Sequence, residues 1–196
     1  MQDVWDNCCA LEILNKGFEI GENVGGNEHA DTATVYNNIG NVMQDMGNNV
    51  GALEMLNRAI AIREKVLGKE HPDTATSYSN IGTTMLVMGD NVGALEMHTK
   101  ALTICEKILG EEHPYTANSY NSIGAVMQAT GDNVGALKMY NKDLAIREKV
   151  LGKEHPDTAE SYSNIWLLYQ AMGNTVDALK MPNQDLVVSR LRVRRT

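Results

Sequence analysis

One five-residue string returns along this chain at a constant interval. His-Pro-Asp-Thr-Ala begins at His71 and again at His155, and a near copy begins at His113. A weaker copy begins at His29, so each string starts 42 residues after the one before it. A fixed period in this range is typical of proteins built from stacked structural repeats. Because each repeat in such a protein contacts mainly its neighbours, the sequence predicts an elongated surface formed by successive repeats and implies no single pocket.

Each repeat begins with a pattern that predicts an α-helix. Tyr36, Ile39, Gly40 and Met43 are spaced i, i+3, i+4 and i+7, which is one face of a helix. The small residue at the third of these positions allows a partner helix to approach closely. Gly47, which also recurs every 42 residues, is expected to end this helix in a left-handed conformation that other residues resist.

A second helical pattern follows in each repeat. Between Ala52 and Val66 the apolar residues form two stripes, which predicts burial against the first helix of the same repeat and against the next repeat. Gly68 is expected to stop this helix, and Pro72 to open the next one, where a missing N–H costs nothing. Ten of the eleven methionines fall on three repeat positions, which predicts that they fill the core.

The charge of the chain is unevenly distributed. The net charge is −8, but residues 186–196 contain four arginines and no acidic residue, which leaves −12 on residues 1–185. An acidic body argues against a nucleic-acid partner, because binding to phosphates requires clustered Lys and Arg. The basic segment can contact an anionic surface, although such a segment is more often simply solvated.

The cysteines and the apolar residues indicate the cellular setting. Cys8, Cys9 and Cys105 are not preceded by a secretory signal, and 18 consecutive apolar residues occur nowhere. We therefore expect a cytoplasmic protein with free thiols and no membrane span.

No group of residues in the sequence is typical of a catalytic or metal site. The four histidines of the repeated string share one register, and copies on successive repeats should lie about 10 Å apart. Metal ligands must lie within about 2 Å of one point, so we expect these histidines to be corner residues that hydrogen-bond locally. No Ser/His/Asp grouping, phosphate-binding loop or Cys-x-x-Cys pair is present. The sequence thus predicts no enzyme activity, no cofactor and no metal.

The repeat resembles a known family. The pattern of residues on the two helices resembles the tetratricopeptide repeat: Gly40 follows larger residues on the first helix, and Ala52, Leu56 and Ala59 follow on the second. The ordinary unit of that repeat has about 34 residues. The segment 61–75 is similar to the long-unit class found in kinesin light chains, although a heptad segment for motor binding is not present. The resemblance covers nearly the whole chain. It implies an all-α protein, a right-handed α-solenoid of antiparallel helix pairs.

The period divides the chain into predicted segments. They are an incomplete repeat at 1–28 that contains only a second helix, repeats at 29–70, 71–112 and 113–154, a degenerate repeat at 155–185, and a basic tail at 186–196. Pro182 is expected to break or kink the second helix of the degenerate repeat. Asp143 replaces the alanine of the first repeat and is expected to weaken packing. Because neither end carries an evident capping repeat, self-association through the ends is possible.

The resemblance also implies where a partner binds, because the first helices of this family line the inner surface. The predicted peptide-binding residues are Thr34, Asn38, Asn41, Asp45, Asn80, Thr83, Asn118, Ser122 and Asn164. Asn38, Asn80 and Asn164 share one register, and an amide can pair with the backbone of an extended peptide. The alternative is that these amides bond between neighbouring helices or face water. The Lys/Arg pair with which relatives bind acidic C-termini is absent, which argues against an acidic peptide end.

Two functions are consistent with these patterns. The favoured one is a non-catalytic adapter that binds an extended peptide or protein segment in a concave groove, with no nucleic-acid or membrane partner. The alternative is a structural scaffold, or a part of a longer array, that acts by end-to-end stacking or self-association.

Overall fold

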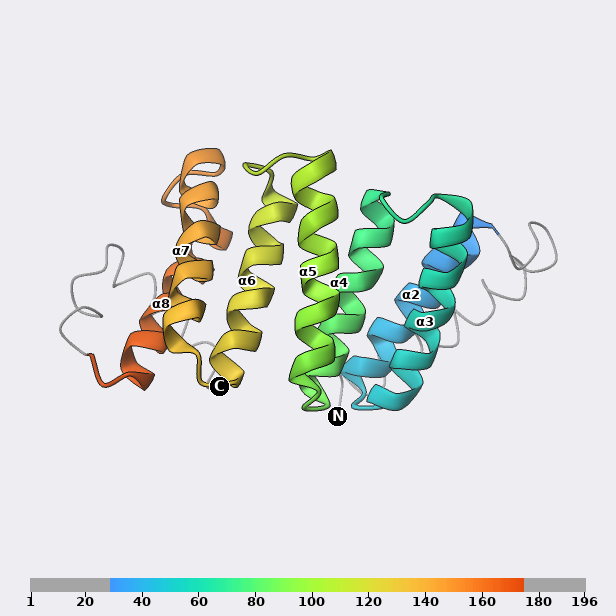
Figure 1. The fold of residues 1–196 in the computed structure, drawn as a ribbon, viewed down its shortest axis with the longest axis horizontal. Coiled ribbons are helices and arrows are strands. Elements are labelled where there is room, and N and C mark those ends of the chain that lie inside the picture. Colours follow the sequence, from blue (N-terminus) through green and yellow to red (C-terminus); the bar gives the residue numbers. More distant parts are fainter. Residues whose placement is uncertain (1–28, 175–196) are drawn as a thin grey trace. The chain divides into compact units, whose positions relative to one another are not determined.

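The structure, a computed structural model, describes residues 29–174 as an all-helical chain (Figure 1). The helices in this range are α2 (Ala30–Asp45), α3 (Asn49–Val66), α4 (Pro72–Val87), α5 (Asn91–Ile108), α6 (Pro114–Ala129), α7 (Asn133–Val150) and α8 (Pro156–Ala171). The first helices α2, α4, α6 and α8 alternate with the second helices α3, α5 and α7, as the sequence predicts. The predicted lone helix near the N-terminus, the kink at Pro182, the basic tail and the uncapped ends lie outside the described residues.

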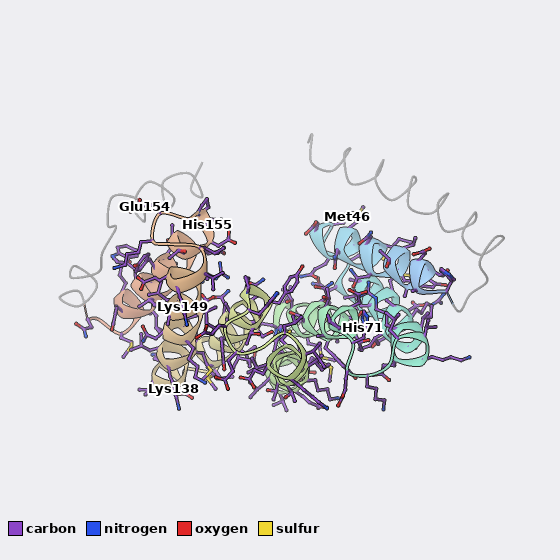
Figure 2. The ribbon with its side chains drawn as sticks, turned by 90° about the horizontal axis from the view of Figure 1, so that it is seen from above. Met46, His71, Lys138, Lys149, Glu154 and His155 are labelled. Carbon is purple, nitrogen blue, oxygen red and sulfur yellow. The ribbon has the colours of Figure 1, made fainter. Side chains whose placement is uncertain are left out.

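Each first helix is capped by the histidine that precedes it. Nδ1 of His29, His71, His113 and His155 accepts a hydrogen bond from the backbone N–H two residues further on, at 3.1 to 3.3 Å. Figure 2 shows His155 on the turn that joins α7 to α8. The first backbone N–H groups of a helix lack partners within the helix, so these rings satisfy one of them. The prediction that the histidines are corner residues with local hydrogen bonds is confirmed.

The glycines and prolines also take their predicted places. Gly47 has φ 80°, and the six other glycines at the ends of helices have φ between 73° and 94°. These are left-handed conformations that a Cβ would strain. Pro72, Pro114 and Pro156 stand at the first positions of their helices.

The helices form two compact units, divided between Ile104 and Cys105. In unit 1, α3 packs against both α2 and α4, and in unit 2, α7 packs against both α6 and α8. A Cβ added at Gly82 would lie 2.8 Å from Nε2 of His98, and one added at Gly124 would lie 2.7 Å from Cε1 of Tyr140. The predicted close approach at this glycine register is therefore confirmed.

Two predictions about the core are wrong in part. Met46, Met88 and Met172 are 41–46 % exposed, because they are C-cap residues just beyond the last turn of a first helix. On α3, Val66 is also exposed, whereas Arg63 is buried among the apolar residues. The buried face of the second helix is thus narrower than two full apolar stripes, and it includes a charge.

Candidate interaction surface

The predicted peptide-binding residues of unit 1 lie on α2 and α4. Thr34, Asn38, Asp45 and Thr83 are exposed, while Asn41 is partly buried. The hydroxyl of Thr83 donates to a backbone carbonyl of its own helix. The aspartate is the one charged residue among these five.

A buried arginine of α3 supports the start of this surface. The side chain of Arg63 donates from Nη1 to the backbone oxygen of Asp73 at 2.8 Å and to Oγ of Ser77 at 2.9 Å. Its Nη2 reaches Oγ1 of Thr34 at 3.4 Å. Burial lowers the pKa of Arg63 from its ordinary value. Three oxygens of neutral groups therefore satisfy a guanidinium that is only 6 % exposed.

The equivalent arginine of unit 2 has a carboxylate partner. Nε of Arg147 donates to Oδ1 of Asp143 at 2.6 Å, and Nη2 donates to Oδ1 of Asn118 at 2.8 Å. The second carboxylate oxygen of Asp143 accepts from Oγ of Ser161 at 2.5 Å. Burial raises the pKa of this carboxyl group. The expectation that Asp143 weakens packing stays a prediction, but its side chain is fully buried within a hydrogen-bonded network, which the sequence did not predict.

The two arginines were missed as structural residues by the sequence analysis. A signal was present: each is followed fourteen residues later by a serine that belongs to its network, Ser77 in unit 1 and Ser161 in unit 2. Arginine on a helix is usually solvated, so the spacing alone gave no reason to place it in the core.

The asparagine register joins neighbouring first helices within each unit. Nδ2 of Asn80 on α4 donates to Oδ1 of Asn37 on α2 at 2.9 Å. In unit 2, Nδ2 of Asn164 on α8 donates to Oδ1 of Asn121 on α6 at 2.8 Å. Each bond uses one of the two N–H groups of the donating amide. The carbonyl and the second N–H are not used by these bonds.

The other members of the predicted site differ in how they are held. Asn38 has the same register as Asn80 and is exposed on α2. Ser122, which takes this register on α6, donates its hydroxyl to the backbone oxygen of Asn118 at 3.0 Å. The interhelical bonds of the alternative are therefore present for Asn80 and Asn164, and peptide binding by this register stays a prediction.

The described part of the chain offers neither a metal site nor a membrane-spanning helix. Within residues 29–174, no group of three or more His, Cys, Asp or Glu side chains is placed to hold a metal ion. None of the helices in the same range has the length and apolar character needed to cross a membrane.

Comparisons with known proteins identify the repeat. A family model described as tetratricopeptide repeat matches residues 10–65, 31–91, 84–142 and 121–184. No curated protein sequence matches the chain. Among solved structures, BtubC (BKLC) from P. vanneervenii is 21 % identical with a TM-score of 0.79, over 99 % of this chain and 75 % of that one.

Two further structures place the fold among helical repeats. A putative kinesin light chain of Podosopora anserina with nearly identical TPR-like repeats is 25 % identical with a TM-score of 0.75, over 100 % of this chain and 92 % of that one. A Rap protein complexed with competence and sporulation factor is 15 % identical with a TM-score of 0.76, over 89 % of this chain and 47 % of that one. These matches confirm the predicted all-α helical repeat solenoid and its similarity to the repeats of kinesin light chains.

Proposed function

Because the chain belongs to the tetratricopeptide repeat family, whose repeats generally mediate protein–protein interaction, we propose that it is a non-catalytic adapter. Its partner is an extended peptide or protein segment that lies against the first helices of the repeats. The residues that hold this segment are those of the predicted site, and the asparagine register binds its backbone.

The observation that carries the proposal is the way in which Asn80 and Asn164 are held. Each side chain is fixed by one hydrogen bond to the neighbouring first helix, so its amide plane is oriented before a partner arrives. A fixed side chain loses little conformational entropy on binding, which strengthens binding. The remaining carbonyl and N–H match the alternating donors and acceptors of a peptide backbone.

Two buried arginines of the second helices hold residues of this surface in position. Arg63 reaches the hydroxyl of Thr34, and Arg147 reaches the amide oxygen of Asn118. Two predicted site residues at the start of their helices are therefore positioned from the second helix. We assign the arginines a positioning role, since their own side chains are buried.

The residues of the site favour a neutral or basic partner. Asp45 is charged, whereas Thr34, Asn38, Asn80 and Thr83 are neutral, and none of the proposed site residues is basic. An acidic segment would meet no cation on this surface. The Rap protein, whose structure holds competence and sporulation factor, supports a binding role for a protein of this fold.

A peptide-display screen on the immobilised full chain tests the proposal. Peptides that it selects should bind the chain at least about tenfold more weakly after Asn38, Asn80 and Asn164 are changed together to Ala, because each lost hydrogen bond contributes about 0.5–1.5 kcal/mol. The matched control changes Asn57 and Asn141, which are exposed on the second helices, to Ala. Equal binding by both variants, with helical content unchanged, would refute the amide register as the peptide site.

A further inference from the structure

The outward stripe of the first helices becomes apolar along unit 2. On α6 the stripe continues from Ser122 to two alanines, and on α8 it continues from Asn164 to a leucine and an alanine. The leucine, Leu167, is 37 % exposed although the next residue in the chain is fully buried. We call these four side chains the apolar end, which consists of Ala125, Ala129, Leu167 and Ala171.

The two helices that carry the apolar end are joined on both sides of its first members. Nδ2 of Asn164 on α8 donates to Oδ1 of Asn121 on α6 at 2.8 Å. Further along the same helices, Met127 of α6 packs against the buried cluster that contains Leu168 of α8. The first residues of the apolar end lie between these two contacts on both helices, so the four side chains belong to one surface of unit 2.

The same positions in unit 1 are mostly polar. Asn41 stands at the register of Ala125, and Thr83 stands at the register of Leu167. Asp45 follows one turn later on α2. A threonine at the leucine position is therefore compatible with the packing of a first helix, so the fold of the repeat does not require the exposed leucine. Contiguous exposed apolar residues of this kind mark interaction sites.

The segments that form the apolar end carry no charge. Residues 121–131 and 163–173 include no Asp, Glu, Lys or Arg. A charged group of a partner would lose water there and gain no ion pair from these segments. An apolar group would instead remove Leu167 from water, which favours binding. This part of unit 2 is therefore suited to an apolar side chain of a partner.

The distance to the asparagine register identifies the source of that side chain, so this inference rests on the proposed function. Leu167 follows Asn164 by three residues, which is a rise of about 4.5 Å along the helix. Side chains alternate along an extended peptide, so a peptide whose backbone bonds to Asn164 presents every second side chain to the protein. Ala125 is small and leaves room for such a side chain beside the leucine. We propose that the apolar end binds an apolar side chain of the same extended peptide and selects partners that carry one.

A substitution scan of the bound peptide tests this specificity. The probe is a peptide that the display screen selects, labelled with a fluorophore, and its anisotropy is measured with the full chain. Each apolar residue of the peptide is changed in turn to Ser. One position should lose at least tenfold in affinity, because a large buried apolar side chain contributes that much. A peptide that tolerates Ser at every apolar position, or that contains no apolar residue, would overturn the proposal.

A variant of the chain locates the effect at the apolar end. Ala125→Asn combined with Leu167→Thr copies the residues of unit 1 at these positions, so the fold should be preserved. The variant should bind the unchanged peptide at least tenfold more weakly, and the sensitive Ser substitution should then cost little more, because the interaction is already lost. The matched control, Val134→Ser, changes a valine that is 76 % exposed on α7 and should leave binding unchanged.

The outcomes separate this proposal from the adapter function. Peptides that lose affinity when the asparagines are changed to Ala, but bind the Ala125→Asn, Leu167→Thr variant at full strength, would refute the apolar end and leave the adapter function in place. The opposite pattern would support the apolar end and refute the amide register. A screen that selects no peptide would overturn both proposals.

Discussion

Replacing His98 by Leu should remove a large part of the acid sensitivity of this fold. His98 is 1 % exposed on α5 and lies against Gly82, and its Nδ1 has no hydrogen-bond partner among the described residues. Burial lowers the pKa of its imidazole from 6.5 to about 4. Leu56 holds the same register in the first repeat and is fully buried, so leucine fits the equivalent space there.

The magnitude follows from the difference in proton binding between the folded and the unfolded chain. The folded-state pKa is depressed, so between pH 6.5 and about 4 the unfolded chain binds a proton at His98 that the folded chain does not bind. The free energy of unfolding therefore falls as the pH falls through this window. At about 1.36 kcal/mol per pKa unit, the loss between pH 7 and pH 5 is about 2 kcal/mol. The leucine variant lacks this loss.

Urea unfolding followed by circular dichroism measures the effect. The free energy of unfolding should be determined at pH 7 and pH 5 for the natural chain and for His98→Leu, so that contributions from all other groups cancel in the comparison. The reverse change, Leu56→His, is the matched control and should introduce a new acid sensitivity in the first repeat. If His98→Leu and the natural chain lose the same free energy between the two pH values, the imidazole is not buried in its neutral form.

Three other substitutions test the packing of unit 2 by the same urea assay. Arg147→Met should lower the free energy of unfolding by about 3–5 kcal/mol, because it leaves the carboxylate of Asp143 buried without a cation. Asp143→Ala reproduces the first repeat, in which Ala59 takes this position and the equivalent guanidinium is buried without a carboxylate. It should lower the free energy of unfolding by less than half as much as Arg147→Met. Equal losses of free energy in the two variants would contradict this account. Gly124→Ala should cost about 1–3 kcal/mol, because the added methyl group would meet the ring of Tyr140, and unchanged stability would show that the ring moves aside freely.

Much of the fold follows from the sequence because the repeat strings act locally. Gly47 and its copies need a left-handed backbone, and Pro72 and its copies tolerate only the first turn of a helix, so these residues set the ends of helices without help from distant contacts. The close approach at Gly82 was also predictable, since glycine at one position of an apolar face leaves room for a neighbour. Local rules of this kind are why helix order and helix pairing could be predicted.

The candidate site was less predictable because the hydrogen-bond partners of its side chains lie far away in the sequence. An amide such as Asn80 satisfies its hydrogen bonds equally well with water, with a peptide or with Asn37 on the neighbouring helix, and the sequence holds no preference among them. Arg63 is buried only because three oxygens from separate parts of the chain meet around it. Asp143 likewise becomes a structural residue through Arg147 and Ser161. Such networks depend on packing in three dimensions.

The adapter function is tested most directly by the side-chain amides themselves. In nuclear magnetic resonance spectra of the full chain, a peptide chosen by the display screen should shift the Nδ2–H signals of Asn80 and Asn164 in proportion to its occupancy. The amides of Asn57 and Asn141, exposed on the second helices, should not move. Saturating peptide that leaves Asn80 and Asn164 unshifted would contradict binding along the first helices.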